Sequence, residues 1–215
     1  MITPEEAGIP SAAVERFLDR LEKEELCMHG FLLQRDGETL AEGYWAPFSK
    51  KRPHRMYSVS KSMTSLAVGL LEAEGRLRLE DRICDYFPDK LPEDPAPELT
   101  LMTIRDMLRM ATCHEKTTYK QAADADWTRT FFTVKPGHRS GAVFSYDTSA
   151  THTLGALVER LNGRSLLDFL RERLFSRLGM NGEMRWLKDP VGVCQGGSGL
   201  VMTLEDLARA AAFCL

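Results

Sequence analysis

The segment Ser58-Val59-Ser60-Lys61 places a hydroxyl and an amine at a spacing that suits nucleophilic chemistry. A serine hydroxyl is a weak nucleophile at neutral pH and needs a partner that accepts its proton. A lysine amine can be that partner where burial lowers its pKa. Side chains three residues apart share one face of a helix, so a helix that begins here brings Lys61 close to Ser58. The free N–H groups at the start of such a helix also suit a developing oxyanion.

The residues after Ser58 predict that helix. Apolar side chains recur at helical spacing, at Val59, Met63, Leu66 and Leu70. Gly75 suits the position that follows a helix C-terminus. A plainer interpretation of the same residues is a serine that caps the helix, followed by a lysine in solvent. The S-x-x-K spacing by itself leaves both interpretations open.

Composition and charge exclude several classes of protein. The 215 residues are 43% hydrophobic and 27% charged, as in an ordinary globular protein, and the net charge of −3 argues against a nucleic-acid partner. The first residues lack the basic and apolar regions of a signal peptide, and the longest apolar stretch is too short to span a membrane. The five cysteines are dispersed without a C-x-x-C pair. This is typical of reduced thiols, so we expect a cytoplasmic protein.

The remaining pattern predicts an α+β fold. A helix at 11–25 precedes a β-hairpin of 28–35 and 39–45, joined at Asp36-Gly37. Helices are then expected at 103–110, 124–134 and 150–161, after Ser165 and after Thr203, with a surface loop in the proline-rich stretch 88–97. A hairpin followed mostly by helices is typical of α+β proteins. Because a lone hairpin is marginally stable in water, we expect a segment beyond Leu215 or a second chain to complete the sheet.

A second group of chemical interest is Tyr146, in the sequence Phe144-Ser145-Tyr146-Asp147-Thr148 ahead of the 150–161 helix. A role for this phenol as a base or proton shuttle is what the family resemblance described next implies, and a positive neighbour would favour the phenolate form that such a role needs. The alternative is a buried aromatic side chain that anchors the loop.

With both motifs in this order, the chain resembles the serine β-lactamase and penicillin-binding protein superfamily, above all its class C-like, DD-peptidase and esterase branch. Residues 77–88 are similar to the family's L-x-L-x-D run that ends in Y-F-P, and 196–200 to its Gly-Gly segment before a late helix. The resemblance covers essentially the whole chain. It implies a β-lactamase/DD-peptidase-like fold with a helical lobe and an antiparallel sheet, of which we expect only the N-terminal hairpin in this chain.

The resemblance also implies roles for individual residues. Ser58 would be the acylated nucleophile, Lys61 the amine that helps to deprotonate it, and Tyr146 a base or proton shuttle. No metal or organic cofactor is implied. Thr148 stands where the family has an asparagine, and its hydroxyl lacks the paired donor and acceptor of an amide. A substrate contact at Thr148 therefore favours an ester or small linear amide over a lactam.

Trp127 is a further candidate for substrate binding. With its apolar neighbours Phe131 and Phe132 it would either line a substrate cleft or pack in the core of the helical lobe.

The implied organisation has three parts. Residues 1–79 would form the first part of an α/β lobe with the nucleophile helix, 80–190 a helical lobe that carries Tyr146, and 191–215 a return towards the first lobe. The family's third motif, K-T-G or H-x-G on a late strand, is absent. Its strand would supply an oxyanion donor, and the loss of one such donor costs roughly 100- to 1000-fold in rate. We therefore expect this chain alone to be inactive.

The predicted function is a serine hydrolase that forms an acyl-enzyme with a small-molecule amide, lactam or ester. A non-catalytic module of the same fold that binds acyl compounds or lactams is the alternative.

Two other motifs predict less. His114-Glu115 begins like the zinc motif H-E-x-x-H, but Thr118 occupies the place of the second histidine. Cys113 and His114 are adjacent and cannot normally align as a nucleophile and its base, so a small core thiol is the simpler interpretation of Cys113.

Overall fold

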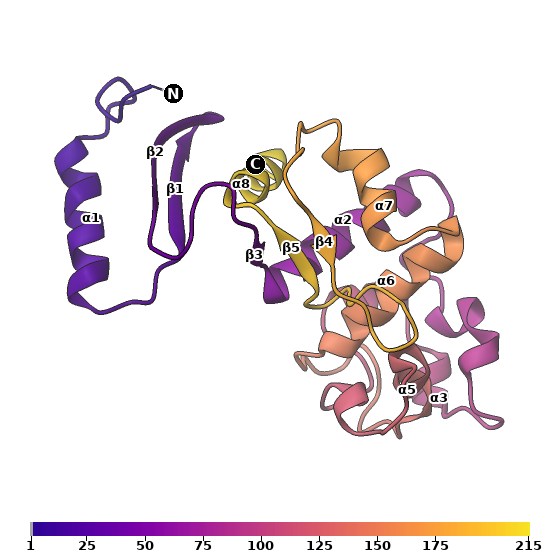
Figure 1. Cartoon of the computed structure of the whole chain (residues 1–215). Helices are drawn as coiled ribbons and strands as arrows, with labels where there is room; N and C mark the ends of the chain where they lie inside the picture. Colours follow the sequence, from indigo (N-terminus) through magenta and orange to yellow (C-terminus); the bar gives the residue numbers. More distant parts are fainter. Residues whose placement is uncertain (1) are drawn as a thin grey trace. The chain divides into compact units, whose positions relative to one another are not determined.

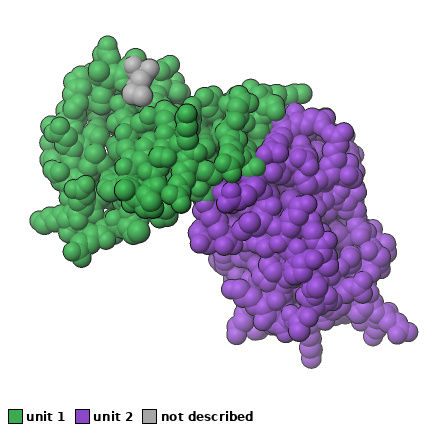
Figure 2. Space-filling model, in the orientation of Figure 1, with its two compact units in different colours: residues 1–54, 174–184, 202–215 green, residues 55–173, 185–201 purple. Residues whose placement is uncertain are grey.

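The computed structural model describes residues 2–215, and Figure 1 labels most of their helices and strands. The chain divides into two compact units (Figure 2). Unit 1 comprises Met1–His54, Leu174–Met184 and Met202–Leu215, and unit 2 comprises Arg55–Arg173 and Arg185–Val201. The lobe boundaries predicted near residues 79 and 190 stay a prediction.

Unit 1 contains the predicted helix and hairpin. Helix α1 spans Ser11–Lys23, and strands β1, Gly30–Arg35, and β2, Glu38–Tyr44, pair antiparallel. Asp36 and Gly37 between them have positive φ angles of 52° and 82°, as a tight hairpin turn requires. Helix α8, Leu204–Phe213, packs against β1.

Unit 2 is built around helix α6, Thr148–Asn162, which packs against helices α2, α4, α5 and α7. These helices span Ser60–Ala73, Ile104–Leu108, Trp127–Thr133 and Leu166–Leu170, and a short helix α3 spans Pro97–Thr100. Every α6 residue from Ser149 to Val158 is buried, because small and apolar side chains surround the whole helix there. The helix ends at Gly163, whose φ of 71° an L side chain adopts only with strain.

Short turns and caps join these elements. The 3₁₀ turns are η1 to η4, at Tyr57–Val59, Ile83–Tyr86, Pro88–Lys90 and Thr118–Lys120, and the π-helical turn η5 is at Arg171–Phe175. Thr103, Ser165 and Thr203 each accept a hydrogen bond from the backbone N–H three residues on, which confirms the helix starts predicted there.

The expectation that the hairpin is the only sheet of this chain is wrong. Strands β3, His54–Arg55, β5, Leu200–Met202, and β4, Arg185–Trp186, form a second sheet in the order β3-β5-β4. Strand β4 pairs antiparallel with the buried strand β5. Strands of two or three residues are too short to show the alternation from which a strand is predicted.

Candidate active site

Ser58 lies in the 3₁₀ turn η1, one step before helix α2, and its side chain is exposed. No side chain caps this turn, so the interpretation of Ser58 as a helix cap is wrong. The Met56 N–H donates to the Leu200 carbonyl of β5 over 2.8 Å, which fixes the start of the turn. Tyr57 follows with a φ of 45°, a strained conformation for a residue with a side chain. The turn therefore presents the Ser58 hydroxyl to solvent from a firmly held backbone.

Lys61 is held beside Ser58 rather than extended into solvent. Its Nζ lies 3.4 Å from Ser58 Oγ, 3.3 Å from Thr148 Oγ1 and 2.6 Å from the Gly197 carbonyl oxygen. An ammonium group has three N–H donors, and these three oxygens give each of them an acceptor. The interpretation of Lys61 as a freely solvated lysine is therefore wrong.

Tyr146 approaches the same ammonium group. Its ring centroid lies 4.9 Å from Lys61 Nζ, and 53% of the residue is exposed, so it is not a buried anchor. The neighbouring Ser58 hydroxyl and, to a smaller extent, the positive charge of Lys61 hold the pKa of Tyr146 below its ordinary value, against the opposing effect of burial. The three predicted catalytic side chains thus lie together.

The Gly196-Gly197 segment supplies a backbone contact that the sequence did not reveal. The Gly197 carbonyl accepts from Lys61, and the Gly196 carbonyl accepts from Thr64 Oγ1 over 2.8 Å. A Cβ atom at Gly197 would lie 2.5 Å from Thr148 Cγ2, and one at Gly196 would lie 2.6 Å from the Thr151 carbonyl. Only glycine permits so close an approach to α6. A carbonyl acceptor is common to all residue types, so no sequence signal identifies it.

Thr148 and Trp127, the two predicted substrate-binding residues, have different surroundings. Thr148 begins α6 and contacts Lys61 directly. Trp127 begins α5, where it stacks on Tyr119 with ring centroids 4.1 Å apart and meets the His152 ring at 5.5 Å. The described contacts of Trp127 thus lie within the helical part of unit 2, and its role in substrate binding stays a prediction.

The Cys113-His114 pair has structural surroundings. Burial raises the pKa of the Cys113 thiol to about 12, so the thiol stays protonated and a poor nucleophile. The buried His114 ring places Nε2 2.8 Å from the Phe131 carbonyl. Among residues 2–215, no cluster of three or more His, Cys, Asp or Glu side chains is arranged to hold a metal ion.

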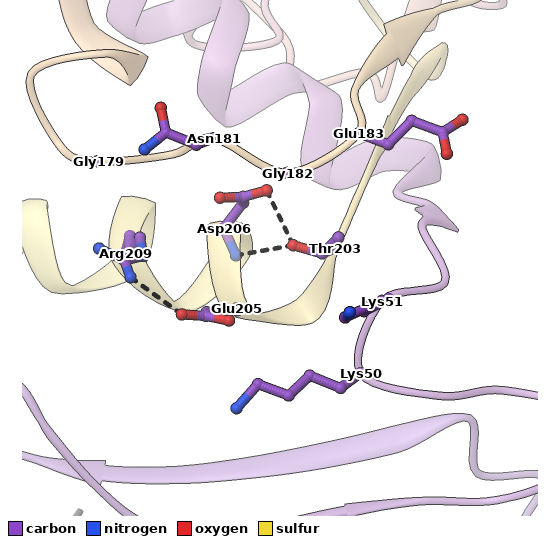
Figure 3. Close-up of a pocket in the computed structure, with 10 residues that line it drawn as sticks. All are labelled: Lys50, Lys51, Gly179, Asn181, Gly182, Glu183, Thr203, Glu205, Asp206 and Arg209. Atoms are coloured by element: carbon purple, nitrogen blue, oxygen red, sulfur yellow. Dashed lines mark hydrogen bonds and ion pairs between the residues drawn. The ribbon is translucent and has the colours of Figure 1, made fainter.

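A cavity of about 450 Å³ in unit 1 is separate from this group of residues (Figure 3). Its charged side chains are largely paired: Arg209 donates to Glu205 over 2.9 Å, and Asp206 accepts from Thr203 over 2.8 Å. Lys50 pairs with Glu42 over 2.8 Å. None of the side chains around Ser58 lines this cavity, so it contributes nothing to the candidate active site.

Comparison with known proteins identifies the family. The profile of the Beta-lactamase family matches residues 5–213, and the chain belongs to that family. A 6-aminohexanoate-dimer hydrolase of Paenarthrobacter ureafaciens is 28% identical over 224 residues, which cover 96% of this chain and 57% of the relative. The chain thus spans little more than half the length of that relative.

Solved structures show the same fold. A structure described as a putative 6-aminohexanoate-dimer hydrolase from Bacillus anthracis matches with a TM-score of 0.73 at 23% identity, over 85% of this chain and 52% of the other. An octameric penicillin-binding protein homologue from Pyrococcus abyssi matches with a TM-score of 0.73 at 18% identity, over 95% of this chain and 56% of the other. The predicted α+β fold of the β-lactamase/DD-peptidase type is confirmed. Within residues 2–215, no helix combines the length and the apolar character needed to cross a membrane.

Proposed function

We propose that this chain carries the nucleophile and the proton-transfer residues of a serine hydrolase that forms an acyl-enzyme. The observation that carries the proposal is the position of Lys61 Nζ, 3.4 Å from Ser58 Oγ and 4.9 Å from the Tyr146 ring centroid. A nucleophile, a proton acceptor and a cation that stabilises the acceptor's charged form are the parts that acyl transfer requires. Membership of the Beta-lactamase family and the hydrolase activity named for the relative support the same conclusion.

In the proposed reaction, the Tyr146 phenolate accepts the Ser58 hydroxyl proton while Oγ attacks the carbonyl carbon of the substrate. The Lys61 ammonium stabilises the phenolate, in keeping with the lowered pKa of Tyr146. The negative charge that develops on the carbonyl oxygen faces the Ser58 N–H. The intermediate then collapses, and the departing amine or alkoxide takes the proton from Tyr146. Water attacks the resulting Ser58 ester, releases the acid and restores the hydroxyl.

We propose a small linear amide or ester as the substrate rather than a lactam. The 6-aminohexanoate dimer named for the relative is a linear amide. Thr148 presents a single hydroxyl beside Lys61, where an asparagine would present both a donor and an acceptor to a lactam side chain. A module that binds acyl compounds without turnover is the second candidate function. The labelling experiment described below separates it from an enzyme.

We further propose that a polypeptide segment beyond Leu215, or a second chain, covers the apolar face of unit 1 and supplies a second oxyanion donor. Helix α1 contains no buried residue, and a cavity of about 360 Å³ beside it is lined by apolar side chains of α1, β1 and Ile9. An uncovered apolar surface of this kind marks a contact site.

The test of the function is labelling of the protein with a fluorophosphonate probe, followed by mass-spectrometric mapping of the modified residue. We expect modification at Ser58 and its loss in Ser58→Ala. The exposed Ser62, in helix α2 four residues after Ser58, provides a matched control, and Ser62→Ala should label normally. Labelling with turnover of a linear amide or chromogenic ester identifies an enzyme, and stable labelling without turnover identifies a binding module. Absence of label at Ser58 contradicts both.

The 215-residue polypeptide alone should give no burst of product with a chromogenic ester, because it supplies one oxyanion donor rather than two. A burst from the isolated polypeptide would contradict the proposed need for a further segment.

A further inference from the structure

A buried carboxylate lies directly between the two residues that reach Lys61 from the start of α6. Asp147 follows Tyr146 and precedes Thr148, and its side chain is fully buried. Its Oδ1 accepts from the Ser149 N–H over 2.8 Å and also from the Ser149 hydroxyl. Its Oδ2 accepts from Thr112 Oγ1 over 3.3 Å. Both carboxylate oxygens are thus engaged by neighbours of the site, although neither touches Lys61.

Residues of the 110–118 segment also anchor the backbone on both sides of Asp147. The Ser145 N–H donates to the Met110 carbonyl over 2.8 Å, just before Tyr146. The Thr148 N–H donates to Thr117 Oγ1 over 3.3 Å, and the Thr118 N–H donates to Ser149 Oγ over 3.0 Å. The segment 110–118 therefore holds the Tyr146 loop in place through hydrogen bonds. Asp147 contributes the side-chain hydrogen bond between the two, to Thr112.

We propose that Asp147 is the positioning residue that fixes the Tyr146 phenol and the Thr148 hydroxyl beside Lys61, through its hydrogen bonds to Thr112 and Ser149. This inference rests on the function proposed for the site. Asp147 is not a catalytic residue in this account, since it acts only through its neighbours on either side.

A helix cap alone does not account for these contacts. Asp126 caps α5 through the Arg129 N–H over 2.9 Å, and its other oxygen pairs with Lys90 in a partly exposed position. Asp147 also caps α6, but its other oxygen contacts Thr112, which is fully buried and 35 residues away in the sequence. Burying a carboxyl group in this way costs free energy unless its hydrogen bonds offset the loss of water. The buried Asp147 cap is thus less favourable in free energy than an exposed aspartate cap would be.

The pKa values of Asp147 and the ionisable groups near it reflect this free-energy cost of burial. His114 faces it from the 110–118 segment, and the Asp147 charge adds to the burial that raises the pKa values of Cys113 and Tyr119. Burial raises the pKa of Asp147 and lowers that of His114, whose Nδ1 is buried without a hydrogen-bond partner. A cheaper cap such as serine would avoid this penalty, whereas a second oxygen is needed to reach Thr112.

Charge and position predict opposite changes in the pKa of Tyr146 when Asp147 is altered. Loss of a nearby negative charge, taken alone, favours the phenolate and lowers that pKa further or leaves it unchanged. Loss of position moves the phenol away from Ser58 and Lys61, and so raises the pKa towards its ordinary value. The direction of the change therefore identifies the role of Asp147.

The experiment is a titration of ¹³Cζ-labelled tyrosine by NMR in the 215-residue chain, with the Tyr146 signal assigned by Tyr146→Phe. In Asp147→Ala we expect the pKa of Tyr146 to rise towards the ordinary value of a tyrosine. In Asp147→Asn we expect it to stay low, because the amide oxygen still accepts from the Ser149 N–H and the amide nitrogen can donate to Thr112 Oγ1. Asp126→Ala removes an aspartate cap elsewhere in unit 2 and should leave Tyr146 unchanged.

A folded Asp147→Ala protein with an unchanged or lower pKa of Tyr146 overturns the proposal, as does an Asp147→Asn protein with a rise as large as that of Asp147→Ala. If Asp147→Ala does not fold, Thr112→Val is the deciding variant, because it removes one hydrogen-bond donor to Asp147 at nearly constant volume. It should raise the pKa of Tyr146 by a smaller amount. An unchanged pKa of Tyr146 in Thr112→Val would overturn the proposal. The titration does not require catalysis. Absence of fluorophosphonate label at Ser58 in the wild-type protein would contradict the proposed function, but it would not affect the titration result on which the role of Asp147 depends.

Discussion

Helices α6 and α1 are similar in length and opposite in environment. Helix α6, with 15 residues, is buried without interruption from Ser149 to Val158, whereas α1, with 13 residues, contains no buried residue. Unit 2 therefore closes a core from its own side chains. The apolar stripe of α1 instead faces a cavity beside β1. A helix can be strongly amphipathic in sequence and still pack its apolar face loosely, as where the Phe17 ring of α1 lies 6.3 Å from the Phe31 ring of β1 beside this cavity.

The difference explains why the Ser58 site is well formed. Ser58, Lys61, Tyr146 and Gly197 all belong to unit 2, and the helix that carries Thr148 is buried without interruption from Ser149 to Val158. A rigid core positions side chains closely, as acyl transfer requires. The proposed covering segment concerns unit 1, where the described residues leave apolar surface exposed.

The largest expected effect comes from shortening one leucine in each helix. Leu154 of α6 is fully buried, so Leu154→Ala should lower the free energy of unfolding by about 2–5 kcal/mol. Leu18 of α1 is only partly buried, so the same change there should cost less than about 1 kcal/mol. Urea denaturation of both variants measures the contrast, and equal losses would contradict the account of two unlike units.

Alanine substitutions at two glycines of unit 2 should change the free energy of unfolding by smaller amounts and in opposite directions. Gly196→Ala would place a Cβ 2.6 Å from the Thr151 carbonyl, so it should destabilise the protein by about 1–3 kcal/mol. Gly69 lies in the exposed part of α2 with no atom within 4 Å of an added Cβ. Gly69→Ala should therefore stabilise by about 0.5–1 kcal/mol, since alanine is the better helix former. Thermal unfolding of both variants checks the signs, and a stabilising Gly196→Ala would refute the close contact with α6.

The parts of this fold that follow from local sequence were predicted well. The Asp36-Gly37 turn and the caps at Thr103, Ser165 and Thr203 act over a few residues, and each is present. The second sheet could not be predicted in the same way. Its strands are two or three residues long and pair across large separations in sequence, so the pattern within each one contains no signal.

The candidate site shows the same limit. Ser58 and Lys61 are three residues apart, so helical geometry brings them together without any long-range information. Asp147 has no visible role until Thr112 is placed against it, and the Gly197 carbonyl lies 136 residues from Lys61. The resemblance to a known family placed Tyr146 near Lys61, whereas the network that holds its loop required the structure.

The smallest expected effect concerns surface ion pairs. Arg160 binds Asp89 through two hydrogen bonds of 2.6 and 2.9 Å in unit 2, and this hydrogen bonding with Arg160 is the main reason that the pKa of Asp89 falls to about 2. The exposed Arg20–Glu24 pair of α1 is longer, at 3.5 Å. Asp89→Asn should cost less than about 1 kcal/mol at neutral pH, and Glu24→Gln should cost nothing measurable.

The pH dependence of the Asp89 pair follows from the depressed pKa of its carboxylate. Its contribution is fully present above the ordinary value of 3.8 and is lost as pH falls towards about 2. The unfolding free energies of wild-type and Asp89→Asn proteins should therefore converge on acidification. A difference that persists or grows at low pH would rule out this ion pair as its source.

The convergence of Ser58, Lys61 and Tyr146 is tested most directly by the pKa of the Tyr146 phenol in the wild-type chain and in Lys61→Met. The account predicts a wild-type pKa below that of an ordinary tyrosine, chiefly through Ser58 and further through Lys61, and a rise in Lys61→Met because the stabilising cation is gone. An ordinary wild-type value that Lys61→Met leaves unchanged would contradict the proposed proton transfer, and with it the assignment of Ser58 as an activated nucleophile.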